Sequence, residues 1–560
     1  MLMHLVSATA TATASVFCAA TLTLQPAPAQ AEASILAAVP ADSYVLAYCA
    51  DFDGLRSRVE RNDWYRLLAS ETGTPLLLDI ASEFDSETGT DLLELLKVGK
   101  HLHGESVFYL TQSAAGFVTV PPTNRGGLAE AMHEWLPDPG PQAVAKQVEL
   151  GGAQIEFVAW RDSEAYGWNA RKGHYAAFVD HPRLMGLFSA DDAGALLATI
   201  EASLASIEAE TRSPLVQQFE AARAGKPSCY GIETFVNLSP FVEEAEQELT
   251  DMLDGVVPDP TGMLGIDGGI WLLAASDVYP GSRIDCSAWM NIPTGTLAAS
   301  LADTFEPLPV ELPAQLPRDL ANLWACRWDL KVFYKSVREA LQNKHGEGGL
   351  EQLDQTLEMA KAMGGIDPID EVINQLDGTF ALFTMRTSAN RAGRDPFNYH
   401  GLGFLASLEN GGAFLAAFER LVSDDGPLES ILDLTTIEGT DVYVTGVEDD
   451  GFGVAFLPQA VLFGLRETMP RSLRALTGIP DSNLLDGSEF RAALDQNQGC
   501  CALAIHDLAG MEAVANERMD GSFTLPPEEG EETGRNPFDA LVVFSVRRTP
   551  EGFRFELHTQ

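Results

Sequence analysis

Short apolar runs alternate with amphipathic stretches along most of the chain. The run at 44–49 predicts a buried strand, and the periodic apolar positions at 55–68 predict an amphipathic helix. Asp51 or Asp53 lies between them, where a carboxylate can accept hydrogen bonds from the first free N–H groups of the helix. The same order recurs later in the chain, at 322–326, Asp329 and 332–341.

Paired apolar runs on short loops lie between these strand–helix units. The runs 107–111 and 116–120 precede a helix expected at 128–136, and a helix expected at 414–421 has the matching place in the second half. Helices that alternate with strand pairs are typical of an α+β fold with a mainly antiparallel sheet. We therefore expect a mainly antiparallel sheet with helices packed on one of its faces.

The two halves of the chain match each other in four stretches that follow the same order. The offset between the matched residues varies by only a few positions, so chance similarity is a poor explanation. The matched pairs are 39–49 with 316–326, 104–110 with 378–383, 177–187 with 455–465, and 270–285 with 541–556. A repeat this long predicts two tandem homologous modules rather than a solenoid.

A proline-rich stretch lies between the two copies. Residues 306–317 contain four prolines, and proline favours extended chain and removes backbone donors. We therefore expect a first module at 32–305, a semi-rigid linker at 306–317 and a second module at 318–560.

The first 31 residues contain no Asp, Glu, Lys or Arg. The stretch 5–24 is mildly apolar, and Ala29-Gln30-Ala31 follows a pair of prolines. This order of an apolar segment, a breaker and a small-residue site predicts a signal peptide at 1–31. We therefore expect an exported protein of the periplasm or the extracellular space, with no transmembrane segment in the mature chain, because no later run of 18 or more apolar residues occurs.

The charge balance is strongly acidic, with 36 basic against 81 acidic residues and a net charge of −45. Such a surface repels nucleic acid and anionic membranes, which argues against both as partners. Solubility is the simplest interpretation of the acidity, and cation binding at clustered carboxylates is the alternative. The hydrophobic fraction of 46% predicts packed domains rather than disorder.

His101 and His103 form the most metal-like fragment of the sequence. Alternate residues of a strand share a face, so two imidazoles could converge on a metal, with Glu105 as a third ligand. The aligned stretch of the second copy, 373–377, contains no histidine. His101 and His103 are therefore weak metal-ligand candidates, and a solvated segment before a strand is the favoured interpretation.

Other possible sites are weaker still. The oxygen-rich stretch 85–91 departs from a calcium loop, and a helix cap before 92–96 explains it better. His174 and His181 with Asp180 and Asp191 could form an acid–base group, but the second copy lacks both histidines. No CxxC occurs, and a disulfide between the adjacent cysteines at 500–501 is an alternative to free buried thiols. We predict no catalytic residue, no cofactor-binding residue and no cofactor.

Both copies open on similar phrases, Val39-Pro-Ala-Asp42 and Leu316-Pro-Arg-Asp319, each followed by an apolar strand and a helix. Together with turns such as 485–490, these phrases resemble large exported bacterial proteins of unknown function whose modules begin with an "LPADT"-like motif. The resemblance implies alternating strands and short helices. It implies no activity, so no functional residue can be carried over.

Tandem modules, an export signal and the lack of a catalytic set favour a non-enzymatic binding or structural protein of the cell envelope or extracellular space. Its partner would be an unknown protein or another component of the envelope. Two alternatives remain: a secreted hydrolase, with or without a metal, and a carrier of an apolar ligand.

Overall fold

The structure is a computed structural model of the chain, and its described residues fall into two compact units. Unit 1 contains described residues between 34 and 239 and from 271 to 289, and unit 2 contains 269–270, 290–509 and 540–559. The described residues are 34–70, 74, 78, 82, 99–123, 125–135, 144–150, 152–159, 175–190, 192–227, 229, 231–239, 269–385, 401–422, 431–445, 451–479, 482–484, 489–509 and 540–559. The predicted signal peptide, residues 1–31, lies outside them.

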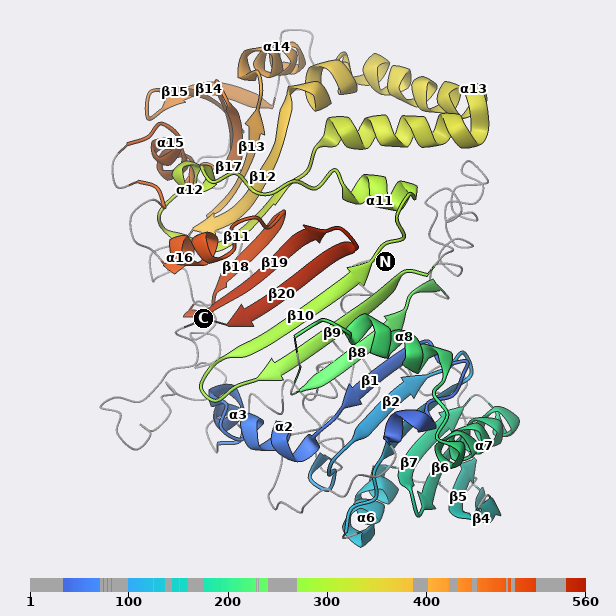
Figure 1. Ribbon diagram of the computed structural model, residues 1–560. Coiled ribbons are helices and arrows are strands. Elements are labelled where there is room, and N and C mark those ends of the chain that lie inside the picture. Colours follow the sequence, from blue (N-terminus) through green and yellow to red (C-terminus); the bar gives the residue numbers. More distant parts are fainter. Residues whose placement is uncertain are drawn as a thin grey trace. The chain divides into compact units, whose positions relative to one another are not determined.

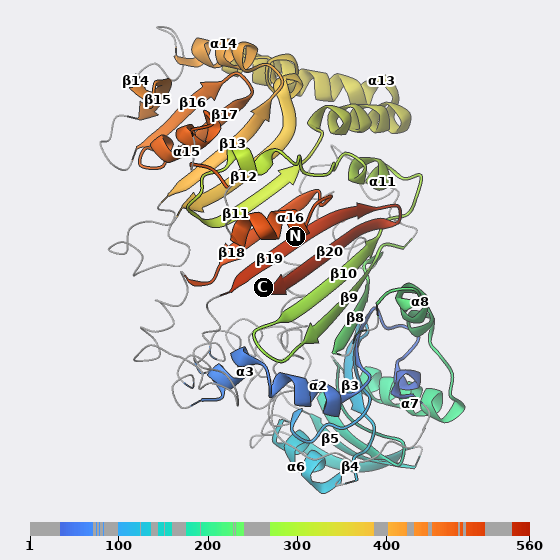
Figure 2. The same cartoon turned by 60° about the vertical axis from the view of Figure 1, so that its left-hand side comes forward.

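Unit 1 is built on an antiparallel sheet (Figures 1 and 2). Its strands, given in the order in which they pair, are β4 (Val144–Leu150), β5 (Ala153–Ala159), β6 (Tyr175–His181), β7 (Leu184–Ala190), β3 (Ala114–Thr119), β2 (Ser106–Leu110), β1 (Val45–Cys49), β8 (Ile232–Asn237) and β9 (Trp271–Val278). Strand β10 (Ile284–Asn291) follows β9 and pairs with it.

Unit 2 is built on a second run of antiparallel strand pairs. Its strands, in the order in which they pair, are β14 (Leu432–Ile437), β15 (Thr440–Thr445), β16 (Phe452–Leu457), β17 (Ala460–Leu465), β13 (Leu402–Leu408), β12 (Leu376–Met385), β11 (Leu320–Arg327), β18 (Ala502–Asp507), β19 (Leu541–Thr549) and β20 (Gly552–Thr559).

The pairing order of the strands is the same in the two units. Each strand of unit 2 has the place of the strand numbered ten lower in unit 1, so that β11 pairs with β12 and β18 as β1 pairs with β2 and β8. The expected α+β class with a mainly antiparallel sheet is confirmed.

Short helices connect the strands of unit 1. They are η1 (Ile35–Ala38), α2 (Phe52–Val59), α3 (Asp63–Leu68), α6 (Arg125–Trp135), α7 (Ala193–Ala209) and α8 (Pro214–Arg223). The predicted cap of the first long helix is Asp51, whose carboxylate accepts from Gly54 N at 2.9 Å. The single helix predicted at 55–68 is wrong: two helices occupy this stretch. Asn62 separates them, because its side chain caps α3 and also donates to the carbonyls of Tyr279 and Gly281.

The helices of unit 2 include one that is much longer than the sequence pattern predicts. They are α11 (Leu297–Ala302), α12 (Leu312–Gln315), α13 (Leu330–Gly364), η3 (Pro368–Val372), η4 (Ile373–Gln375), α14 (Gly411–Val422), α15 (Met469–Leu476) and α16 (Glu489–Gln496). Asp329 caps α13 as expected, and Gly346 divides it into two rods through a positive φ of 63° (Figure 1). None of the described helices is long and apolar enough to cross a membrane.

Helices cover both faces of the unit 1 sheet, which corrects the expectation of a single covered face. Leu46 and Tyr48 of β1 pack in a core with α7 and α8, whereas Cys49 packs on the opposite side with α2 and α6. The physical reason is visible in β1, since Val-Leu-Ala-Tyr-Cys is apolar at both odd and even positions. A strand with two apolar faces must be covered on both sides.

The core of unit 2 lies on one side of its sheet. Leu323 and Ala325 of β11 pack there with residues of α12, α15 and α16. The proline-rich stretch 306–317, expected as a linker, contributes to this core: Leu312 and Leu316 are fully buried within it. In addition, Leu308 N donates to Cys500 O at 2.8 Å.

Candidate functional site: the open face of unit 2

The two histidines predicted as weak metal ligands lie beside α2 in unit 1. His103 Nδ1 lies 2.8 Å from Asp53 Oδ1, and burial together with the neighbouring His103 lowers the pKa of His101. Glu105 is engaged elsewhere, because its carboxylate accepts from Ile35 N at 2.8 Å and from the Tyr48 hydroxyl at 3.0 Å. Among the described residues, no three His, Cys, Asp or Glu side chains gather in a geometry that could hold a metal ion.

The second histidine group is only partly described, since His174 and Asp191 lie outside the described residues, as does the oxygen-rich stretch 85–91. His181 is buried, burial lowers its pKa, and its Nε2 lies 3.8 Å from Glu208 Oε1. Asp180 forms an ion pair of 2.8 Å with Arg125 instead of turning toward the histidine. The described part of this group therefore connects strands and helices rather than forming an acid–base pair.

The six cysteines of the described chain are free thiols. Cys500 and Cys501 are buried and do not form the alternative disulfide. Burial raises the pKa of Cys49 to about 12 and that of Cys500 to about 11. A thiol with so high a pKa is almost entirely protonated near neutral pH, so neither residue is suited to be a nucleophile.

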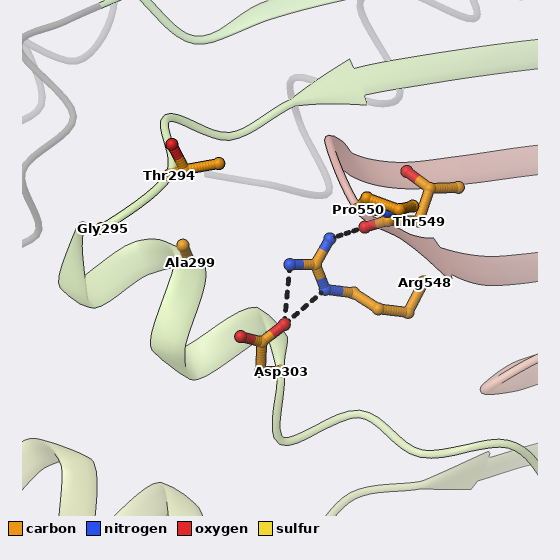
Figure 3. Close-up of a pocket in the computed structure, with 7 residues that line it drawn as sticks. All are labelled: Thr294, Gly295, Ala299, Asp303, Arg548, Thr549 and Pro550. Atoms are coloured by element: carbon orange, nitrogen blue, oxygen red, sulfur yellow. Dashed lines mark hydrogen bonds and ion pairs between the residues drawn. The ribbon is translucent and has the colours of Figure 1, made fainter.

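A shallow pocket of about 390 Å³ lies in unit 2 between α11 and the turn that joins β19 to β20 (Figure 3). Arg548 dominates it, but the guanidinium is fully engaged. Its Nε and Nη2 donate to Asp303 Oδ1 at 3.1 and 2.7 Å, and its Nη1 donates to the carbonyls of Thr549 and Gly552. Because Asp303 neutralises the only cation in the pocket lining, this pocket is a poor anion site.

The most distinctive surface of unit 2 is the sheet face opposite its core. In β11, Leu323 and Ala325 point into the core, so the alternating residues Asn322, Trp324 and Cys326 point to the other side. These three residues are half-buried, whereas Leu323 and Ala325 are fully buried. We call this second side the open face.

Large apolar side chains form a row across the open face. Neighbouring strands place Phe463 of β17 opposite Phe404 of β13, Phe404 opposite Leu382 of β12, and Leu382 opposite Trp324. The row continues from Trp324 through Ala504 of β18 to Phe544 of β19. Side chains directly opposite each other on neighbouring strands are in contact distance, so the row is one continuous surface.

Several members of the open face are unusually exposed for their size. The exposed fractions are 37% for Leu382 and 39% for both Phe452 and Phe463. The rings of Phe452 and Phe463 stack with centroids 5.2 Å apart, and those of Phe380 and Phe404 stack at 6.4 Å. Stacked aromatic rings that remain partly in contact with water are typical of binding surfaces.

The open face is almost free of charge. From β16 to β20, the alternating positions on this side carry no Asp, Glu or Lys, and the only Arg is Arg548 at the end of β19, which is paired with Asp303. This neutrality is notable in a chain with 81 acidic residues and a net charge of −45. The face therefore combines exposure with an apolar composition, which a soluble sheet surface normally avoids.

A small polar group lies beside the middle of the row, on the strands β12, β11 and β18. Asn322 Nδ2 donates to Thr384 Oγ1 at 2.8 Å, and Asn322 Oδ1 lies 3.0 Å from His506 Nδ1. Burial lowers the pKa of His506, so the ring is neutral and its Nδ1–H donates to the amide oxygen. The remaining ring nitrogen, Nε2, is then an acceptor, and the rings of His506 and Trp324 lie side by side with their centroids 4.9 Å apart.

The described helices cover the open face at two outer parts. Ala299 and Ala302 of α11 pack with Phe553 of β20, which is paired with Arg548. Phe418 of α14 packs on Phe456 of β16 with ring centroids 4.8 Å apart. At the start of α13, the helix that follows β11, Phe333 packs edge-on against Trp328, which lies just beyond the end of β11, with ring centroids 4.9 Å apart. In unit 1, by contrast, Phe52 and Leu55 of α2 are buried against the corresponding side of the sheet.

The sequence indicates part of this surface. Residues 320–327 and 376–385 are apolar at both odd and even positions, which indicates two apolar faces. Which face would lack a cover depends on where α13 runs. The first helical turn of α13 is held by the contact between Trp328 and Phe333, which no local pattern predicts.

Comparison with known proteins assigns no family: no protein-family model matches the chain, and no curated protein matches it. A solved structure titled "Structure of crystal form I of TP0453" matches 48% of this chain and 82% of its own chain at 9% sequence identity. Its TM-score is 0.22, which is too low to support an argument about fold or function.

Proposed function

We propose that the protein is a non-enzymatic binding protein of the cell envelope or extracellular space, and that the open face of unit 2 is its docking surface. The observation that carries this proposal is the uncharged row from Phe463 to Phe544, in which every residue except Ala504 stays partly exposed in an otherwise strongly acidic chain. Export rests on the signal-peptide pattern at 1–31.

The energetics favour docking through the large side chains of the row. Complete burial of a Leu or Phe side chain contributes roughly 1.5–3 kcal/mol relative to full exposure. Leu382 and Phe463 are 37% and 39% exposed, so covering each contributes about 1 kcal/mol. A partner that covers these two side chains therefore gains about 2 kcal/mol, or about 30-fold in affinity.

The chemistry of the open face favours binding over catalysis. His506 is its one side chain that could exchange protons near neutral pH, and it is held by the amide of Asn322. A neutral amide, unlike a carboxylate, does not stabilise the imidazolium that a general base must form. Burial also raises the pKa of Cys326, so this thiol is protonated and poorly nucleophilic.

We further propose that the two units descend from one duplicated module. The identical pairing order of their strands supports this, and so do the four matched stretches of sequence, which fall on equivalent strands. The stretch 39–49 ends in β1 and its match 316–326 lies mainly in β11, while 177–187 and 455–465 cover β6–β7 and β16–β17. Duplication allows one copy to keep its sheet covered while the other presents a face for binding.

Fluorescence of Nile red, an uncharged dye that emits strongly in apolar sites, tests the docking surface. The purified chain should bind the dye, and a double variant with Leu382→Ser and Phe463→Ser should bind it about 30-fold more weakly, from the roughly 2 kcal/mol above. Met359→Ser on α13 is the matched control, because Met359 is even more exposed at 60% but lies outside the open face. Equal dye binding by the wild type and the double variant would exclude the open face as the docking surface.

A further inference from the structure

We propose that the occupant of the open face is an amphipathic α-helix of a partner protein, with basic side chains beside its apolar stripe. This inference rests on the proposed function, since it names the partner of the same surface. Three features of the described residues support a helix rather than a small ligand: the cover of the equivalent face in unit 1, the dimensions of the row, and the placement of charge.

Unit 1 shows which kind of element fits this side of the sheet. Cys49 ends β1 opposite Ile232 of β8, and Cys326 has the same place in β11 opposite Ala502 of β18. In unit 1 this side is packed against α2, whose buried residues Phe52, Leu55 and Val59 are spaced as one apolar helix stripe. The same architecture in unit 2 therefore presents a surface that accepts a helix.

The row has the dimensions of a helix-binding surface. From Phe463 to Phe544 it crosses six neighbouring strands, β17, β13, β12, β11, β18 and β19. At about 4.8 Å between strands, the row is about 24 Å long. A helix rises about 1.5 Å per residue, so a helix of about 16 residues lying along the row would span it.

Charge indicates which helix would bind. The chain carries a net charge of −45, whereas the open face itself is neutral. An apolar stripe would lie on the neutral row, and Lys or Arg beside the stripe would be attracted by the acidic surroundings. Acidic helices and anionic lipid surfaces would be repelled by the same field.

The polar group beside Trp324 adds one specific contact. His506 Nε2 is an acceptor, and within the described residues it has no hydrogen-bond partner. A Lys, Arg or Ser of the bound helix can donate to it. This contact would help to fix the register of the helix along the row, because apart from Trp324, which has one indole N–H, the members of the row have hydrocarbon side chains.

Three synthetic 18-residue peptides test the inference by fluorescence anisotropy with the purified full chain. The first has Leu at helical spacing and Lys on its polar face, the second has the same composition in scrambled order, and the third has Glu in place of Lys. The first peptide should bind at least 10-fold more tightly than either of the others at low salt. The double variant with Leu382→Ser and Phe463→Ser should bind the first peptide about 30-fold more weakly than the wild type does. The Met359→Ser variant should bind it as tightly as the wild type.

The outcomes separate this inference from the proposed function. Equal affinity of the ordered and scrambled peptides, or peptide binding that the double variant leaves intact, would overturn the helix as occupant. If Nile red binding still depends on Leu382 and Phe463, the docking surface survives that result. A monomeric neutral amphiphile that binds the face while the ordered peptide does not would assign the surface to a small apolar ligand instead. If the wild type bound neither Nile red nor the ordered peptide, both proposals would be rejected.

Discussion

Glu233 of unit 1 should make the stability of the protein depend on pH. This residue lies on β8, is only 4% exposed, and pairs with Arg223 of α8 through an Nε–Oε1 distance of 2.9 Å. Burial raises the pKa of Glu233 from 4.5 to about 6, the carboxylate of Asp277 adds to the increase, and the Arg223 guanidinium opposes it. The ion pair thus only partly offsets the cost of burying the carboxylate.

The sign of the effect follows from proton binding. The folded protein holds the Glu233 proton more tightly than the unfolded chain, so the contribution of Glu233 to the free energy of unfolding is fully present below about pH 4.5 and is lost as the pH rises through about 6. Each tenfold change in proton affinity corresponds to about 1.4 kcal/mol. The increase in pKa therefore corresponds to a loss of about 2 kcal/mol of stability across this interval.

Urea unfolding at a series of pH values between 4 and 7.5 measures this loss when the wild type is compared with Glu233→Gln. Glutamine keeps the size of the side chain and its hydrogen bond from Arg223, but it does not ionise. Relative to the wild type, the free energy of unfolding of the variant should increase by about 2 kcal/mol between pH 4.5 and 6.5. Above pH 6.5 the difference should not change further. Glu201→Gln on the exposed side of α7 is the control and should follow the wild type. A difference between Glu233→Gln and the wild type that does not vary with pH would refute the reasoning.

Three other substitutions test the packing of the units by urea unfolding. Tyr109→Phe removes a buried 2.8 Å bond to Ser203 Oγ and should cost about 1–2 kcal/mol, with a smaller loss when Ser203→Ala is already present. Asp192→Ala removes the bonds to two N–H groups at the start of α7 and should cost about 1 kcal/mol, whereas Asp192→Ser should retain most of the stability. Gly231→Ala places a Cβ 1.9 Å from a carbonyl oxygen of β9 and should be strongly destabilising, while Gly348→Ala in α13 meets no atom within 4 Å and should be neutral or stabilising. Equal effects of the two glycine substitutions would contradict the close approach at Gly231.

The sequence predicted those features of the fold that depend on neighbouring residues. The strand that the structure places at Val45–Cys49, the cap at Asp51 and the cap at Asp329 follow from local apolar runs and side-chain chemistry. The expected α+β class with an antiparallel sheet follows in the same way from short loops between paired strands.

Other features depend on contacts between distant residues and could not be predicted locally. Asn62 divides the first helix because it binds carbonyls of Tyr279 and Gly281, more than 200 residues away in sequence. The full length of α13 was missed because three glycines between 346 and 349 weaken the helical pattern, although only Gly346 leaves the helical conformation. The candidate site was missed for a related reason: an apolar strand face looks the same in sequence whether a helix covers it or not.

One position shows how a shared framework can give two different surfaces. The register that matches 39–49 with 316–326 pairs Ala47 of β1 with Trp324 of β11. Ala47 is 8% exposed and lies between Phe108 of β2 and Thr234 of β8, so β1 itself carries a small side chain at this place. Trp324 is half-buried and stands between Leu382 and Ala504 in the open row. A large aromatic residue at this place adds contact area for a partner, whereas an alanine adds little. If docking is the role of unit 2, Trp324→Ala should therefore weaken helix binding more than any change at Ala47, although both residues occupy the same place in the sheet.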